Sequence, residues 1–495
     1  MAATDDVSRS AEWPRSLSWS GREPAAVLVL VAAFVVLRSS GLGGPLAEAW
    51  AVLASVVALI SPLAGLLTAV ALGPVDDWPV FGTEAGGRAV LVTAIAISVG
   101  GRAMLGASWS RQRWVIGTPV GLTIASAVVL LIGTGLGVVH TWLRFGPAMG
   151  YQAAQLWATG TGMALIVCLI GVWFGSGGER RPALVAGFAA VAAVGVGLLH
   201  EALPTLIPSS ALAWLIVEDR VLLRLSGVMN APNSMAMLAL LPACLIAAWM
   251  LQRRSWRPWL AGSAALVMLG VAVLLTYSRS AVLAVAAVAV SYAWFVKRTA
   301  ALVILAVVVV GAAVLVPIYV DQRAGNELPG AGLSLQDFFT AGDEIRSAGW
   351  AAAVRMALDS PLIGQGFRSY LVLHTEFGDL DQTAPHNEWL RLYAEEGVIV
   401  GTAGLSFLAA ALVALWRVRG ALALGAFGTL LAYAIMASFN NPLSYAQLNV
   451  PVFALLGTAL GLALRAEIRA PRAARSDRLS DPAAAASKGS SAAGS

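Results

Sequence analysis

The sequence predicts an all-α, polytopic membrane protein with about 12 to 14 transmembrane helices and a large helical loop on the outer face. Hydrophobic residues make up 58% of the 495 residues and charged residues only 12%, and the mean hydropathy is +0.78. Soluble domains carry about 25% charged residues. The composition therefore excludes a set of soluble domains and indicates a chain that lies mostly within the membrane.

Thirteen apolar runs predict membrane helices, because a helix pairs its own backbone groups as lipid requires. An odd number of spans would place the basic N-terminus outside. Either the long second run divides at Ser61 and Pro62 into two short helices, giving about fourteen, or the first run does not span. The runs are 25–37, 46–73, 89–107, 114–143, 154–175, 182–203, 232–251, 258–277, 281–296, 299–319, 387–416, 420–439 and 447–464.

Basic residues gather in alternate connections of the second half, which predicts that those connections are cytoplasmic. They lie at 253–257, 297–298 and 417–419. The turn around Arg279, the loop 320–385 and the turn at 440–442 then face the outer side. This pattern accounts for the net charge of +5 without a nucleic-acid partner.

The apolar runs and the basic connections together divide the chain into segments. The segment 204–230 mixes apolar and charged residues at helical spacing and is predicted to lie along the membrane surface. The predicted segments are a disordered cytoplasmic tail at 1–23, N-terminal transmembrane helices at 24–203, a second membrane domain at 204–464 that includes the loop 320–385, and a basic, disordered cytoplasmic tail at 465–495.

One stretch, TAPHNEWLRLYAEEGVIVG from Thr383 to Gly401, places polar groups where water meets lipid. Thr383 or Asn387 can cap the helix that follows. His386 would lie at the positive end of the helix dipole, which favours the neutral ring that can accept a proton. Gly397 and Gly401 form a small-xxx-small pair that lets a neighbouring helix approach closely. The alternative is a plain helix start with an interfacial histidine.

Two arginines, Arg279 and Arg346, and the neutral His386 on the same predicted membrane face suit a phosphate-bearing substrate, whereas Arg355 could be a surface residue. Arg279, in TYSRS between two helices, is costly there unless it is paired or faces a water-filled cavity; the alternative is a snorkelling arginine. Arg346 and Arg355 lie on a short helix predicted at 345–358, and Arg346 is near its start, where the dipole disfavours a cation unless an anion is close. Guanidinium groups bind phosphate bidentately, so a phosphate-bearing substrate is favoured. Asn233 begins another outer helix and either caps it or contacts ligand.

Adjacent acidic residues occur at 76–77, 218–219 and 395–396. The first two pairs could ligate a divalent cation, but such pairs are also common on solvated loops, and no metal site is predicted. The third pair lies inside an apolar helix, where at least one carboxylate must face protein or a cavity. We expect it to serve as the partner of an arginine.

The ordered motifs of the second half resemble the O-antigen ligase and polymerase superfamily, bacterial membrane proteins that share a C-terminal Wzy/ligase domain. The similarity runs from about Arg224 to Gly401, and the first 200 residues are similar only as a series of helices. Its pieces are RLSGVMNAPNSMA, TYSRSAVLA, the loop helix with Arg346 and Trp350, SPLIGQGF, and HNEWLRLYAEEGVIVG. The resemblance implies a GT-C-like membrane fold.

The resemblance also implies an activity. Such proteins take a glycan from undecaprenyl pyrophosphate on the periplasmic face of the inner membrane and transfer it to an acceptor hydroxyl on a glycan or a lipid A core, without a nucleotide sugar, a cofactor or a required metal. By this similarity Arg279 and Arg346 hold the pyrophosphate and His386 accepts the proton of the acceptor. The further substrate-binding residues that it suggests are Arg224, Asn233, Arg355 and Asn387.

Alternatives remain open from the sequence. A ligase attaches finished glycan, whereas a polymerase lengthens a polyprenyl-linked chain in exopolysaccharide or lipopolysaccharide biosynthesis; the absence of any lipid A feature favours a polymerase. A transporter or flippase for an anionic lipid-linked substrate would predict internal repeats, and none is clear. A metal-dependent oligosaccharyltransferase would use an acidic pair near Asp76 and would be sensitive to chelators.

Overall fold

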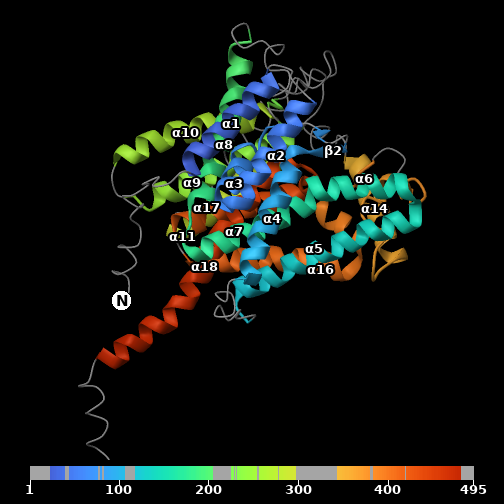
Figure 1. The fold of residues 1–495 in the computed structure, drawn as a ribbon. Helices are drawn as coiled ribbons and strands as arrows, with labels where there is room; N and C mark the ends of the chain where they lie inside the picture. The colour runs from blue at the N-terminus through green and yellow to red at the C-terminus, as the bar shows by residue number, and fades with distance from the viewer. Residues whose placement is uncertain are drawn as a thin grey trace, which may run out of the picture.

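The all-α, polytopic fold is confirmed by the computed structural model, in which helices make up nearly all of the described chain (Figure 1). The described residues also contain turns, loops and a short antiparallel hairpin of β1 (Pro79–Val80) and β2 (Thr83–Gly86). The structure describes residues 23–39, 44–75, 79–80, 83–105, 117–204, 225–227, 229, 231–253, 256–276, 278–296, 343–378, 383–418 and 420–480.

Within these residues, seven segments are long and apolar enough to cross a membrane, and five shorter apolar helices accompany them. The N-terminal helices are α1 (Glu23–Ser39), α2 (Pro45–Ile60), α3 (Pro62–Ala71), α4 (Gly87–Leu105), α5 (Pro119–Phe145), α6 (Pro147–Thr159), α7 (Thr161–Gly177) and α8 (Arg181–Ala202). The later helices are α9 (Pro232–Leu251), α10 (Trp256–Leu275), α11 (Arg279–Val296), α14 (Asp343–Asp359), α15 (Tyr370–Leu373), α16 (Glu388–Val418), α17 (Ala421–Ala437), the 3₁₀ turn η3 (Pro442–Ser444) and α18 (Ala446–Ser480).

Glycines bring α7 and α18 into close contact at the centre of the bundle. A Cβ on Gly175 or Gly457 would collide with the backbone of the facing helix, so only glycine fits at these positions. At the end of the pair, the Arg465 guanidinium donates to the carbonyl of Gly177 at 2.6 Å. The apolar part of α18 is consequently almost entirely buried, and 94% of the residues in its most apolar stretch lie inside the protein.

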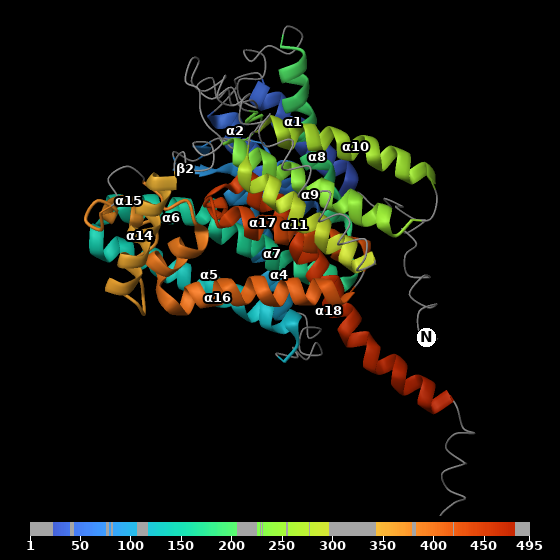
Figure 2. The same ribbon diagram turned by 180° about the vertical axis from the view of Figure 1, so that it is seen from behind.

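Helices α5 and α16 lie side by side and antiparallel, as both ribbon views show (Figures 1 and 2). Gly133 on α5 faces Val400 on α16, and Gly137, one turn later on α5, faces Glu396, one turn earlier on α16. The loop segment with α14 lies at one end of this pair, on the right in Figure 1. The far end of α18 leaves the bundle on the opposite side.

The hydroxyl of Tyr292 on α11 ties three helices together. Its oxygen lies 3.1 Å from the carbonyl oxygen of Cys244 on α9 and 2.9 Å from that of Leu424 on α17, and the two carbonyls share its single proton. Both bonds are buried, which fixes how these helices are aligned along their axes.

Helix boundaries confirm some predictions and correct others. The break at Ser61 and Pro62 divides the second run into α2 and α3 as predicted. A second break, at Gly160, divides the predicted run 154–175 between α6 and α7. The tail predicted to be disordered from residue 465 is wrong as far as Ser480, because α18 continues through it; alanine, arginine and leucine there favour a helix. The run 299–319 and most of the 204–230 segment lie outside the described residues.

Candidate functional site

A turn between α17 and α18, residues 438–445, joins several motifs that are far apart in the sequence. The Asn233 amide at the start of α9 donates to the side-chain oxygen of Asn440 at 2.8 Å. The Trp389 indole at the start of α16 donates to the hydroxyl of Ser438 at 3.2 Å. The first turns of α9 and α16 therefore meet at this turn.

The same turn also contacts α14. The rings of Trp350 and Phe439 lie 6.4 Å apart, centroid to centroid. Arg346 is about one helical turn before Trp350 on α14 and is half-buried. The backbone N–H of Leu443 donates to the buried carboxylate of Glu388, the first residue of α16. The predicted loop helix, confirmed as α14, is thus seated beside the start of α16.

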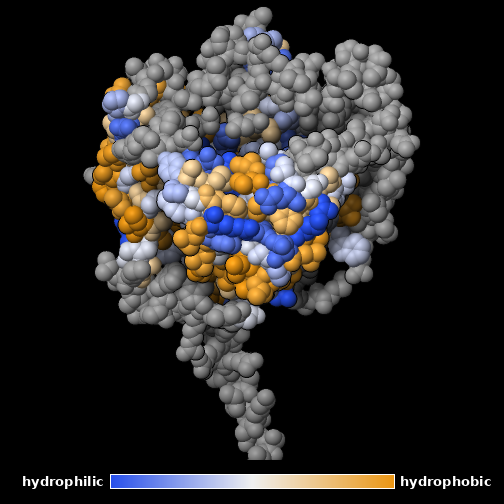
Figure 3. Space-filling view, turned by 90° about the vertical axis from the view of Figure 1, so that its right-hand side faces the viewer, coloured by the Kyte–Doolittle hydropathy of each residue, from blue (hydrophilic) through white to orange (hydrophobic). Residues whose placement is uncertain are grey.

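Arg279 begins α11 at the same end of the bundle. Four residues earlier, the Leu275 carbonyl at the end of α10 accepts from the N–H of Leu225 at 3.0 Å. Gly227 then packs against Met235 in the first turn of α9, which carries Asn233 nearby. This chain of contacts brings the starts of α9, α11 and α16 and the first half of α14 to one end of the bundle. The side of the molecule that carries α14 shows a band of hydrophilic residues between apolar flanks (Figure 3).

Asn387 caps α16, as one of the two predicted alternatives, and the cap orients the residue before it. The Asn387 Oδ1 accepts from the N–H groups of Trp389 and Leu390, each at 3.1 Å. His386 has φ +48°, in the left-handed region that non-glycine residues adopt sparingly. The cap and the turn it closes thus hold His386 half-buried at the N-terminus of the helix.

The first two turns of α16 contain a buried charge cluster. Arg391 Nη1 bonds to Glu395 Oε2 at 2.6 Å, and Arg391 Nε bonds to Glu388 Oε1 at 3.0 Å. The side chains of these residues are at most 8% exposed. The predicted pairing of the 395–396 acidic pair with an arginine holds for Glu395, but Arg391 and Glu388 were not among the predicted site residues. Their spacing, Glu-x-x-Arg-x-x-x-Glu, puts three charges on one face of an apolar helix and could have revealed the cluster.

Gly397 plays a different role from the one predicted. It has φ +76°, which kinks α16, and a Cβ there would collide with the backbone of Leu362 and Gly364. The N–H of Val398 donates to the carbonyl of Pro361 at 2.8 Å. The expected small-xxx-small contact between helices is therefore wrong: Gly397 lets the SPLIGQGF loop, rather than a helix, approach α16.

Helix α16 binds that loop through further hydrogen bonds. The N–H of Gly366 donates to the Glu395 carbonyl at 2.7 Å, and the N–H of Tyr370 donates to the Glu395 carboxylate at 3.3 Å. From the other side, Thr141 on α5 donates to the Phe367 carbonyl at 2.7 Å. The loop is thus fixed between α5 and α16.

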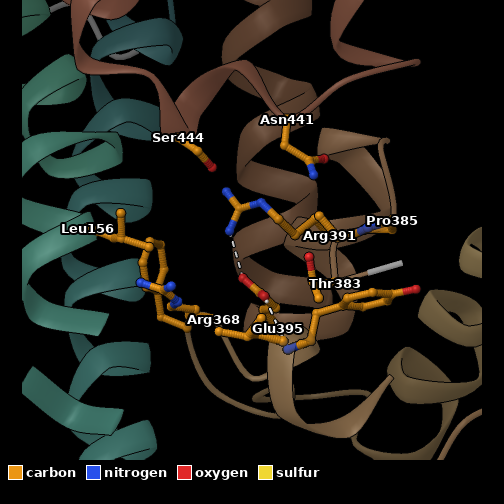
Figure 4. Close-up of a pocket in the computed structure, with 12 residues that line it drawn as sticks. Leu156, Arg368, Thr383, Pro385, Arg391, Glu395, Asn441 and Ser444 are labelled. Carbon is orange, nitrogen blue, oxygen red and sulfur yellow. Dashed lines mark hydrogen bonds and ion pairs between the residues drawn. The ribbon is translucent and has the colours of Figure 1, made fainter. Parts of the chain in front are cut away.

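A cavity of about 190 Å³ opens beside the cluster (Figure 4). Its wall includes Pro385, next to His386, and the 438–445 turn supplies two residues to it. In Figure 4, Asn441 and Ser444 lie on one side of the Arg391 guanidinium and Glu395 on the other. The polar lining consists of Arg368, Thr383, Arg391, Glu395, Asn441 and Ser444.

The remaining predicted residues have varied placements. Arg355 is exposed and its Nε donates to the Phe377 carbonyl at 2.7 Å, a contact that holds α14 against the turn after α15. Arg224 and the acidic pairs at 76–77 and 218–219 lie outside the described residues. In the part of the chain that the structure describes, histidine, cysteine and acidic residues form no group of three that could hold a metal ion.

The helices and the site define a polytopic membrane protein with a polar site at one end of its bundle. Residues 264–405 match the family model described as O-antigen ligase. The match begins in α10 and includes α11, α14 and the first half of α16. It indicates a glycosyltransferase-type enzyme with a role in surface-polysaccharide biosynthesis. A search of curated proteins found no match.

Proposed function

We propose that this protein transfers a glycan from undecaprenyl pyrophosphate to an acceptor hydroxyl at the outer face of the bacterial inner membrane, without a metal. The anomeric carbon–oxygen bond to pyrophosphate breaks, and the electron pair leaves with the pyrophosphate. The acceptor oxygen forms the new bond to that carbon and loses its proton. The products are the glycosylated acceptor and undecaprenyl pyrophosphate.

In this proposal Arg279 and Arg346 bind the pyrophosphate. Charge grows on the leaving group as the bond breaks, so guanidinium groups held in place by the protein stabilise the transition state more than the ground state. His386 accepts the proton of the acceptor hydroxyl, a role that contributes about 10²–10⁴-fold in other enzymes. Asn387, as the helix cap, positions His386.

One observation carries the proposal: the contacts of the 438–445 turn and of the 225–235 segment gather the starts of α9, α11 and α16 with the first half of α14. These four segments contribute Asn233, Arg279, His386 and Arg346. The family match over 264–405 contains three of these four residues, Arg279, Arg346 and His386. We favour polymerisation of a polyprenyl-linked chain over ligation to a lipid A core.

The test uses the purified full chain in detergent with an undecaprenyl-pyrophosphate glycan as donor. His386→Asn is the informative variant, because asparagine tolerates the left-handed backbone at this position. We expect it to lose about a hundredfold or more in rate, while His200→Asn at the end of α8 keeps its activity. Normal transfer by His386→Asn would contradict the assignment of His386 as the base. Strong inhibition by EDTA would contradict a metal-free mechanism.

The glycan profile of a strain that lacks the protein separates the two reactions. Loss of long chains supports a polymerase. Long lipid-linked chains that fail to reach lipid A instead support a ligase.

A further inference from the structure

The cavity beside the Arg391 cluster contains a polar group that the fold leaves without a partner. Asn441 is 7% exposed, and its buried side-chain oxygen has no hydrogen-bond partner. A buried amide oxygen without a partner costs about 1–3 kcal/mol of desolvation. Asn441 also lines the cavity, so rotation of its side chain would let this amide bond a ligand hydroxyl.

The charged side chains in the cavity wall are two cations, Arg368 and Arg391, and one anion, Glu395. Arg391 is already paired with Glu388 and Glu395. The Glu395 carboxylate itself lines the cavity, so an entering phosphate would meet a fixed negative charge. The lining offers hydroxyl and amide groups at Thr383, Ser444 and Asn441 instead.

The size and the apolar wall restrict the ligand further. About 190 Å³ is below the roughly 300–1,000 Å³ of pockets for drug-sized ligands, so the cavity holds a group of about one ring. Phe367, Leu156 and Leu371 form its apolar side. A sugar ring has polar hydroxyls around its rim and apolar C–H faces, which fits a cavity with both kinds of wall.

From these observations we infer that the cavity binds a single uncharged sugar ring of the acceptor, with Asn441 and Ser444 bonding its hydroxyls. This inference rests on the proposed function and assigns one subsite of it. Thr383, Ala384 and Pro385 line the cavity and lead directly into His386. A ring bound here would therefore present a hydroxyl next to the proposed base.

The test measures binding of methyl glycosides of common hexoses and N-acetylhexosamines to the detergent-purified full chain by saturation-transfer NMR. Ser444 is exposed on η3, so Ser444→Phe can fill the cavity with little change to the core. The matched control is Thr375→Phe, which adds the same side chain at an exposed position outside the cavity lining. We expect at least one glycoside to bind, Ser444→Phe to abolish its signal, and Thr375→Phe to retain it.

A second variant, Asn441→Ala, distinguishes a loss of binding from a folding defect. Loss of one ligand hydrogen bond is expected to weaken glycoside binding about five- to tenfold, with an unchanged melting temperature. Binding of no glycoside by the unaltered protein, equal binding by Ser444→Phe, or displacement of the glycoside by inorganic pyrophosphate would each overturn the inference. If Ser444→Phe binds normally while His386→Asn is inactive in transfer, the subsite is wrong and the proposed function stands.

Discussion

Arg391 and Glu395 form a buried ion pair one turn apart on α16, with 2.6 Å between Nη1 and Oε2. The pair links two parts of the site. Arg391 also holds Glu388, which accepts from the 438–445 turn, and Glu395 accepts from the N–H of Tyr370 beyond the SPLIGQGF loop. The cluster thus fixes the turn and the loop to the same helix.

Removing Arg391 is expected to destabilise the protein strongly. Arg391→Met keeps the approximate volume but leaves two buried carboxylates close together, and breaking a buried pair in this way costs about 3–5 kcal/mol. The measurement is thermal unfolding of the detergent-purified protein. Arg417→Met, at an exposed position near the other end of the same helix, is the control and should change stability by less than about 0.5 kcal/mol. Equal melting temperatures for the two variants would contradict the structural role of the cluster.

Gly397→Ala is expected to impair folding for two separate reasons. Alanine is strained at φ +76°, and its Cβ would collide with the backbone of Leu362. The expected cost is above about 1 kcal/mol. Gly195→Ala is the matched control, because a Cβ at that position on α8 would meet open space. If both alanine variants melt alike, the loop does not depend on the close approach at Gly397.

Sequence patterns could predict the fold class because membrane helices are defined by local composition. The break at Ser61–Pro62 and the short helix near Arg346 followed from proline and from hydrophobic period. The break at Gly160 could not be predicted, since an isolated glycine is tolerated inside many membrane helices. Gly397 was misjudged because its conformation is set by a loop some 35 residues earlier in the chain.

The candidate site was predictable only in part. Asn387 follows a local rule for helix caps, so the sequence indicated it. The importance of the 438–445 turn depends on contacts with α9, α14 and α16, and nothing in its own residues indicates those contacts. The cavity at Asn441 depends on the same long-range packing.

Asn387→Ala is expected to lower both stability and transfer. Loss of a side-chain cap costs about 0.5–2 kcal/mol. The same change loosens the turn that holds His386, so the rate should fall further than the stability loss explains. Asn387→Ser restores a capping oxygen and should recover most of both properties. A rate for Asn387→Ala equal to that of the unaltered protein, at a lowered melting temperature, would show that the cap is structural only.

Arg279→Lys tests the proposed mode of phosphate binding. Lysine keeps the charge but cannot bind phosphate with two parallel hydrogen bonds, so we expect about a tenfold or greater loss of transfer with normal protein levels. The control is Arg253→Lys. Arg253 follows the C-terminal end of α9, far along that helix from the end near Arg279, and its replacement should leave transfer unchanged. Full activity of Arg279→Lys would mean that Arg279 contributes charge alone or does not bind the donor.

The short connection between α7 and α8 should make stability depend on pH. Burial alone would raise the pKa of Glu179, but hydrogen bonds from the Arg181 side chain, at 2.6 and 2.9 Å, and from backbone N–H groups lower that pKa overall. A carboxyl whose pKa is lower in the folded state stabilises the protein above its unfolded pKa of about 4.3 and loses that contribution as the pH falls through the folded value. Both side chains are about one-quarter exposed, at 24% and 22%, so the effect should be at most about 1 kcal/mol.

Melting temperatures of Glu179→Gln, Arg181→Gln and the double variant, measured between about pH 3 and pH 8, test this dependence. At neutral pH each single variant should melt below the unaltered protein, and the double variant should melt close to the singles because the interaction is already lost. The difference between the unaltered protein and Glu179→Gln should shrink below about pH 4, as the carboxyl becomes protonated in the folded state. A difference that stays constant across this range would mean that Glu179 acts through packing and its backbone contacts, without its charge.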